Sequence, residues 1–222
     1  MKDYIKLSFI LFLICFISAF LLSFVNSKTS PIKEKILSDK EYKAKKEVFE
    51  EAEKFLEPVK YKDIEIYLCL DKNEKEIGAI IKAAPSGFSG NIFILFGINL
   101  NGNITGLKVI SHTETPGLGS KMEEINKKKS EELYKKNNLI KKDKPWFQEQ
   151  FKNFNYNDLI VDKDGGKIDS LTAATISSRA VCNGIKNAAK KFFDWYKNKN
   201  NMNNKNIGDE EQIDAQTSAT KK

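Results

Sequence analysis

Hydroxyl-bearing side chains gather in one short stretch of the sequence, SLTAATISSRA, at residues 170–180. Thr172, Thr175, Ser177 and Ser178 lie there beside small alanines, directly before a segment with helical periodicity. One hydroxyl is enough to cap a helix, by accepting hydrogen bonds from its first N–H groups. A helix N-terminus also attracts anions, because those N–H groups are unpaired and carry partial positive charge. The stretch therefore fits either an ordinary cap or a site for a phosphate-bearing ligand, even one esterified to a threonine.

The composition argues against several other kinds of site. The chain has 37 basic and 30 acidic residues, but Arg179 is its only arginine, whereas nucleic-acid binding favours arginine for bidentate phosphate contacts. With one histidine, His112, and three cysteines without C-x-x-C spacing, we expect no metal site. Cys69 and Cys182 could pair outside the cytoplasm, yet their apolar surroundings favour two buried thiols. Arg179 could add positive charge beside the hydroxyl stretch.

An uncharged apolar run at residues 7–25 is long enough to cross a bilayer as a helix. Its length, and the lack of an A-x-A-like cleavage site, favour a retained single-pass anchor over a cleaved signal peptide. Residues 1–6 form a short flank. Lysines lie on both sides of the run, so charge counting leaves the orientation open.

The residues beyond the anchor predict an α+β fold. Strong helix formers make 26–58 a helical stalk, with its helix over 31–57 between two prolines. A domain at 59–197 opens with apolar and β-branched runs separated by turn residues, among them Asn101-Gly102, which predicts an antiparallel meander with flanking helices. The expected strands are 65–71, 76–84, 91–99 and 104–112. After the strands we expect a helix near 121–138, a short helix or turn at 145–151, and a short strand with a glycine turn at 159–169. A helix over 176–197 and a disordered polar tail at 198–222 complete the chain.

The residues DSLTAAT (169–175) resemble the attachment motif of proteins that carry flavin mononucleotide (FMN) as a phosphoester on threonine. The resemblance implies that Thr175 bears the FMN, that Asp169 and Thr172 occupy the acidic and first hydroxyl positions of the motif, and that a separate flavin transferase forms the link. The chain departs from the motif at Ala173, where the family usually has glycine. If that residue needs a positive φ, alanine is disfavoured there.

Other segments resemble the same family in the same order. The loop HTETPGLGS (112–120), the glycine loop GFSGNI (87–92) and PWFQEQF (145–151) are similar to stretches of the FMN-binding domain in the G subunit of Rnf electron-transport complexes, which is related to the C subunit of sodium-translocating NADH:quinone reductase. We expect Trp146 and Phe147 to be core or partner contacts. The implied cofactor-binding residues are Glu114, Thr115, Pro116, Gly117, Leu118, Gly119, Thr172, Ala174, Thr175, Ser177 and Ser178.

The resemblance implies an electron-carrying flavoprotein within a redox-driven ion translocase of the cell membrane. Electrons would pass between ferredoxin and NAD through partner subunits, without independent substrate turnover, and the main domain would lie outside the cytoplasm. The alternatives within the family are the reductase C subunit and a free-standing extracytoplasmic flavoprotein. A flavin-free structural or assembly subunit is the alternative of another class, and Ala173 is the residue that suggests it.

Overall fold

The computed structural model describes residues 2–137 and 143–219, which divide into two compact units, Met1–Lys43 and Ala44–Lys222. The first unit consists of most of helix α1 (Lys2–Val48). Within α1, Tyr4–Ser27 is long and apolar enough to cross a membrane, and its side chains are exposed in the isolated chain. The predicted anchor, 7–25, lies inside this span.

The C-terminal end of α1 differs from the predicted stalk helix. The helix continues without a break through Pro31 and ends at Val48, whereas a helix over 31–57 was expected. It ends early because the following residues are used by the second unit: Phe49 and Ala52 are buried, and β1 (Lys54–Phe55) pairs with a strand of the sheet. Tertiary packing has overridden helix propensity at this point.

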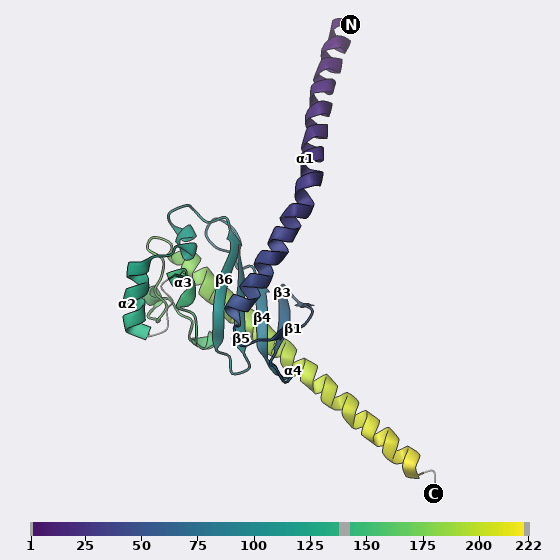
Figure 1. Ribbon diagram of the computed structural model, residues 1–222, viewed down its shortest axis with the longest axis vertical. Helices are drawn as coiled ribbons and strands as arrows, with labels where there is room; N and C mark the ends of the chain where they lie inside the picture. Colours follow the sequence, from purple (N-terminus) through teal and green to yellow (C-terminus); the bar gives the residue numbers. More distant parts are fainter. Residues whose placement is uncertain (1, 138–142, 220–222) are drawn as a thin grey trace. The chain divides into compact units, whose positions relative to one another are not determined.

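The sheet of the second unit is the expected antiparallel meander. Its strands are β2 (Val59–Tyr61), β3 (Ile64–Leu70), β4 (Glu76–Ala83), β5 (Ile92–Asn99) and β6 (Ile104–His112). They run in the order β1-β3-β4-β5-β6, with β2 also paired to β3 (Figure 1). Asn101-Gly102 forms the predicted β5–β6 turn, in which Gly102 adopts a φ of 83°.

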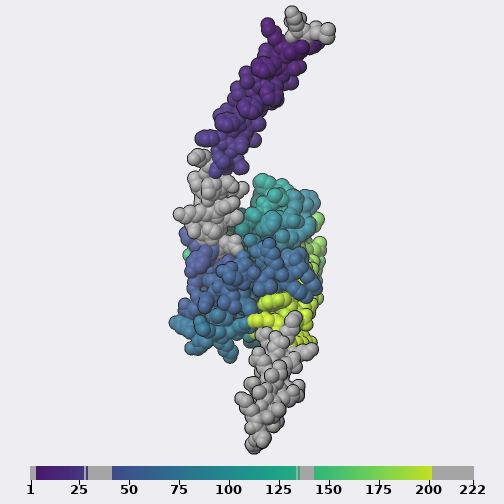
Figure 2. Space-filling model, turned by 90° about the vertical axis from the view of Figure 1, so that its right-hand side faces the viewer, coloured from purple at the N-terminus to yellow at the C-terminus, as the bar shows by residue number. Residues whose placement is uncertain are grey.

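Alternation along the strands gives the sheet two buried faces. One side of β5, with Ile92, Ile94, Phe96 and Ile98, packs in the main core with helix α4 (Thr175–Ala219). Residues on the other side, such as Leu95, pack against the chain from Ala44 to Ala52. The strands therefore lie between α4 and the end of α1 (Figure 1), and Figure 2 shows part of α4, in yellow-green, against the blue strand region.

Short helices connect the sheet to α4. Where one helix near 121–138 was predicted, the structure has two, the 3-10 helix η1 (Gly119–Glu123) and helix α2 (Lys127–Asn137), separated by non-helical residues 124–126. The last predicted residue, 138, lies outside the described residues. Helix α3 (Trp146–Glu149) confirms the short helix of PWFQEQF, and Trp146 and Phe147 are buried in the main core. The 3-10 helix η2 (Tyr156–Asp158) follows.

The segment 159–169 forms no regular strand, which corrects that prediction. It contains the 3-10 helix η3 (Asp162–Asp164), a glycine turn and one isolated bridge between Val161 and Ile168. The bridge joins residues of the same short segment, so it fastens a loop and adds no strand to the sheet.

Helix α4 begins at Thr175, close to the predicted start, and continues to Ala219, beyond the predicted end at 197. The expected polar tail of 198–222 is therefore helical over its described residues. Its composition still resembles that of disordered segments, and disorder there stays a prediction.

Candidate functional site

Several of the predicted site residues, among them Glu114 and Thr175, meet at a cavity beside the start of α4. It has a volume of about 340 Å³, within the usual range for small-ligand sites. The walls come from the glycine loop after β4, the loop after β6 and the first turn of α4. The lining residues are Phe88, Glu114, Thr115, Leu118, Gly119, Ala173, Ala174, Thr175, Ile176 and Ser177.

The first turn of α4 presents unpaired donors at this cavity. In the described chain, the backbone N–H groups of Thr175, Ile176 and Ser177 have no hydrogen-bond acceptor, and the first bonded N–H of the turn is that of Ser178, which donates to the Ala174 carbonyl at 3.1 Å. The Thr175 side chain is half-buried, and among the described residues its hydroxyl also lacks a partner. This arrangement suits an anion or a phosphoester, and the Thr175 hydroxyl makes no capping bond.

Ser178 has a structural place in the same turn. Its hydroxyl is buried, accepts a hydrogen bond from the Leu171 N–H at 2.9 Å and donates to the Ala174 carbonyl at 3.0 Å. It therefore fixes the chain entering α4 and does not line the cavity.

The carboxylate of Glu114 joins three parts of the wall. One oxygen accepts from the N–H groups of Phe88 and Ser89, at 2.8 and 3.2 Å, and the other accepts from the Ser177 hydroxyl at 2.6 Å. Glu114 is only 5% exposed, and its own N–H donates to Nδ1 of His112. The wall is thus held together by hydrogen bonds between segments far apart in the sequence.

The other residues of this loop, 115–119, lie partly in the cavity wall and partly on the exposed surface outside it. Thr115, Leu118 and Gly119 line the cavity, while Pro116 and Gly117 are exposed outside it. The Gly117 N–H donates to the Ser120 hydroxyl at 2.9 Å, and the Thr115 and Ser89 hydroxyls lie 3.2 Å apart. Pro116 and Gly117 therefore shape the turn, and Thr115, Leu118 and Gly119 face the cavity.

Asp169 and Thr172, the other motif residues, lie outside the cavity wall. The backbone of Asp169 exchanges two hydrogen bonds with the Gln150 side chain, and its carboxylate lies 3.4 Å from the Lys129 amine. Thr172 is exposed. Asp169 thus anchors the loop that leads to the hydroxyl stretch.

Arg179 points to a different partner from the one expected. Its guanidinium donates two hydrogen bonds to the Asp164 carboxylate, at 2.6 and 2.8 Å, and it is not part of the cavity wall. The bidentate contact lowers the pKa of Asp164 and fastens the glycine turn after η3 to α4.

Sequence reasoning did not single out two residues of the wall, Phe88 and Ile176. Both are large, apolar and exposed, at 67% and 52%, and Leu118 beside them is 40% exposed. An apolar residue inside a glycine loop, or one directly after Thr175, was the available signal. These side chains give the cavity the apolar rim that a planar aromatic ring system requires.

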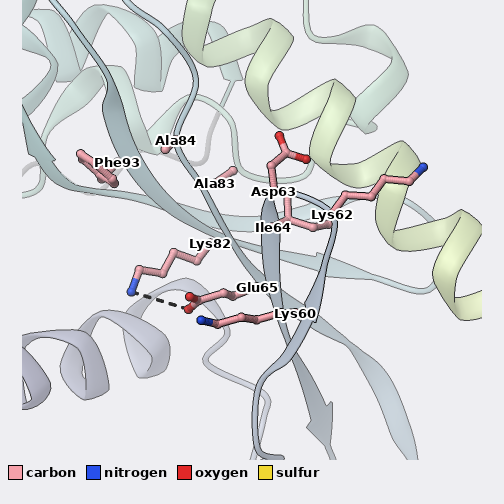
Figure 3. A pocket seen from close by; sticks show the side chains of 9 residues that line it. All are labelled: Lys60, Lys62, Asp63, Ile64, Glu65, Lys82, Ala83, Ala84 and Phe93. Atoms are coloured by element: carbon pink, nitrogen blue, oxygen red, sulfur yellow. Dashed lines mark ion pairs between the residues drawn. The ribbon is translucent and has the colours of Figure 1, made fainter.

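The cysteines and a second cavity provide no comparable arrangement. Burial raises the pKa of both the Cys69 and Cys182 thiols to about 12, and both thiols are free, as expected. A cavity of about 290 Å³ beside β3 and β4 is lined by three lysines and two carboxylates, of which Lys82 and Glu65 form an ion pair (Figure 3) with an N–O distance of 3.7 Å. In the described part of the chain, no group of His, Cys, Asp or Glu residues is placed to hold a metal ion.

The donors and walls of the first cavity fit FMN. Unpaired N–H groups and a free hydroxyl suit its phosphate, and the apolar rim suits its ring. Residues 87–190 match the family model described as FMN-binding domain, and this range includes every residue of the cavity wall. This part of the chain is therefore similar to FMN-binding domains.

The most informative relatives are named as the G subunit of an ion-translocating oxidoreductase complex. One from Shewanella piezotolerans is 41% identical over 124 residues, which cover 54% of this chain and 50% of the relative. Others from Aliivibrio fischeri and Pasteurella multocida are 40% and 36% identical, covering 55% and 57% of this chain and 52% and 57% of those proteins. The chain thus resembles these G subunits and spans about half the length of these curated relatives.

Proposed function

We propose that this chain is the electron-carrying flavoprotein subunit of a membrane-bound, ion-translocating oxidoreductase complex, with FMN attached covalently to Thr175. The observation that carries the proposal is the Thr175 hydroxyl, which lies in the cavity of an FMN-binding domain without a partner among the described residues. The names of the similar proteins, each a G subunit of an ion-translocating oxidoreductase complex, support the assignment to such a complex.

When bound, FMN would supply the ability to accept and pass on electrons, and the protein would supply its position and surroundings. The N–H groups of the first turn of α4 would hold the phosphate. Phe88, Leu118 and Ile176 would contact the ring system and keep water from it. The residues of the cavity wall suggest no further substrate, so electrons would enter and leave through partner subunits.

The placement in the cell follows from the same proposal. The apolar span Tyr4–Ser27 would anchor the chain in the membrane, with the FMN-binding domain outside the cytoplasm and a flavin transferase maturing it there. A covalent link has a physical purpose in that location, because a cofactor that dissociated outside the cell's interior would be lost.

The test is covalent flavin on the full-length chain produced together with a flavin transferase. We expect a fluorescent band on a denaturing gel under ultraviolet light, and an intact mass larger by one FMN phosphoester. Thr175→Ala abolishes both signals, because it removes the only oxygen that the proposal esterifies. Ser111→Ala is the control, since it removes an exposed hydroxyl outside both the attachment motif and the cavity wall, and it keeps both signals.

A flavin-free structural or assembly subunit is the second candidate, and one observation favours it. Ala173 occupies a backbone conformation with a φ of 62°, at the position where the attachment motif usually has glycine. A folded wild-type chain that stays dark and unmodified in the presence of the transferase would support this candidate and exclude the covalent flavoprotein.

A further inference from the structure

We propose that Glu114 is a positioning residue that clamps the wall of the flavin cavity and whose negative charge holds the midpoint potential of the flavin down. The inference deepens the proposed function and rests on it, because the second effect requires a flavin in the cavity.

The clamp joins segments that are remote in the sequence. Phe88 and Ser89 lie 26 and 25 residues from Glu114, and Ser177 lies 63 residues away. The glycine loop, the loop after β6 and the first turn of α4 all meet at this one carboxylate. Ser177 is also two positions beyond Thr175, so its hydrogen bond fixes the turn that presents the attachment oxygen.

Two glycines leave the space that the Glu114 carboxylate occupies. A Cβ atom added at Gly87 would collide with one Glu114 carboxylate oxygen, and one added at Gly119 would collide with the other. Gly87 and Gly119 therefore let the backbone of both loops approach the carboxylate, each next to a different oxygen. A larger residue at either position would push the loops apart.

The charge of the Glu114 carboxylate is inferred from its hydrogen bonds. All three partners donate hydrogen bonds to the carboxylate oxygens, which act as acceptors only, as in an ionised carboxylate. Glu114 is nearly buried and lines the cavity, so its charge is poorly screened by water there. Reduction adds negative charge to a flavin, and a carboxylate in the wall of its cavity opposes that addition. Glu114 would thereby make the bound flavin a stronger reductant.

Two substitutions separate the clamp from the charge. Glu114→Gln keeps an oxygen for the Phe88 and Ser89 N–H groups and an amide that can donate to the Ser177 hydroxyl, but removes the charge. Glu114→Asp keeps the charge and shortens the reach by one methylene. Glu124→Gln is the matched control, because it removes a charge from an exposed side chain outside the cavity wall.

The measurements are the midpoint potential of the flavin-loaded full-length chain and the hydrogen exchange of the amides of residues 88–90. Glu114→Gln raises the potential, with a change of about tenfold in the reduction equilibrium, or about 30 mV for a two-electron couple. It leaves the exchange rates near those of the wild type. Glu114→Asp speeds exchange of these amides about tenfold or more and moves the potential less. The control changes neither quantity.

A wild-type potential in Glu114→Gln overturns the role of the charge, and wild-type exchange in Glu114→Asp overturns the clamp. Because glutamine preserves all three contacts, a Glu114→Gln chain that fails to fold also overturns the proposal. If the wild type carries no flavin, the proposed function fails, while the exchange measurement on the flavin-free chain still decides the clamp.

Discussion

A single backbone angle at Ala173 links the sequence motif to the shape of the site. The residue has a φ of 62°, in the left-handed region, and lies in the turn closed by the Ala174 N–H donating to the Leu171 carbonyl at 3.0 Å. An L-residue other than glycine pays roughly 1–2 kcal/mol for this conformation. A glycine, which the attachment motif usually has at this position, would avoid that cost, so Ala173 holds strain two residues before Thr175.

At the residue scale, we expect Ala173→Gly to stabilise the folded chain by about 1 kcal/mol, because the relief of strain exceeds the added entropy of the unfolded chain. Ala180→Gly, inside helix α4, is the matched control and should destabilise by about 1 kcal/mol. Chemical denaturation of both variants measures the two free energies. A loss of stability in Ala173→Gly would mean that the alanine methyl contributes packing that outweighs the strain.

The sheet face opposite α4 is shaped to receive the end of α1. Gly106 in β6 brings this strand against the backbone of Val48, where an added Cβ would lie 2.8 Å from the Val48 Cα. The neighbouring Thr105 hydroxyl donates to the Val48 carbonyl at 2.6 Å, which satisfies an acceptor at the helix C-terminus. The two elements are therefore matched in both volume and hydrogen bonding.

At the element scale, Gly106→Ala should destabilise the second unit by about 1–3 kcal/mol, because the methyl group overpacks this contact. Thermal or denaturant unfolding gives the change in free energy. Ser111→Ala, at an exposed position of the same strand, serves as control and should change stability by no more than about 0.5 kcal/mol. Equal stabilities of the two variants would contradict the close fit of Val48.

The compact unit that carries the site begins at Ala44, earlier than the predicted boundary at 59. Ala44, Val48, Phe49 and Ala52 are all buried, and they cover strand residues of the second core cluster. The end of the apparent stalk is therefore part of the folded domain.

At the scale of the whole molecule, a chain of residues 44–222 should fold, accept FMN and unfold at a temperature close to that of the full-length protein. A chain of 59–222 should be less stable by at least about 3 kcal/mol, since it lacks the buried Val48 and Phe49 side chains. Calorimetry of the two truncated chains compares them directly. Identical unfolding temperatures would show that residues 44–58 contribute no packing energy.

Local patterns in the sequence predicted the elements that carry the site. Alternating apolar residues and the Asn101-Gly102 turn predicted the meander, because side-chain direction in a strand repeats every two residues. The apolar run at 7–25 predicted the candidate membrane helix, and the hydroxyl stretch predicted the start of α4 near Thr175. The motif resemblance predicted the similarity of residues 87–190 to FMN-binding domains.

Non-local contacts had no such signal. The sequence alone left Arg179 free to face a phosphate, and only the fold brings it to Asp164. From the sequence, Glu114 was only one residue of a predicted loop. The fold brings its carboxylate into hydrogen-bonding contact with the Phe88 N–H and the Ser177 hydroxyl. Periodicity and turn chemistry are properties of neighbouring residues and can be read along the chain. Which side chains meet across a cavity depends on how whole elements pack, and that is decided only when the chain has folded.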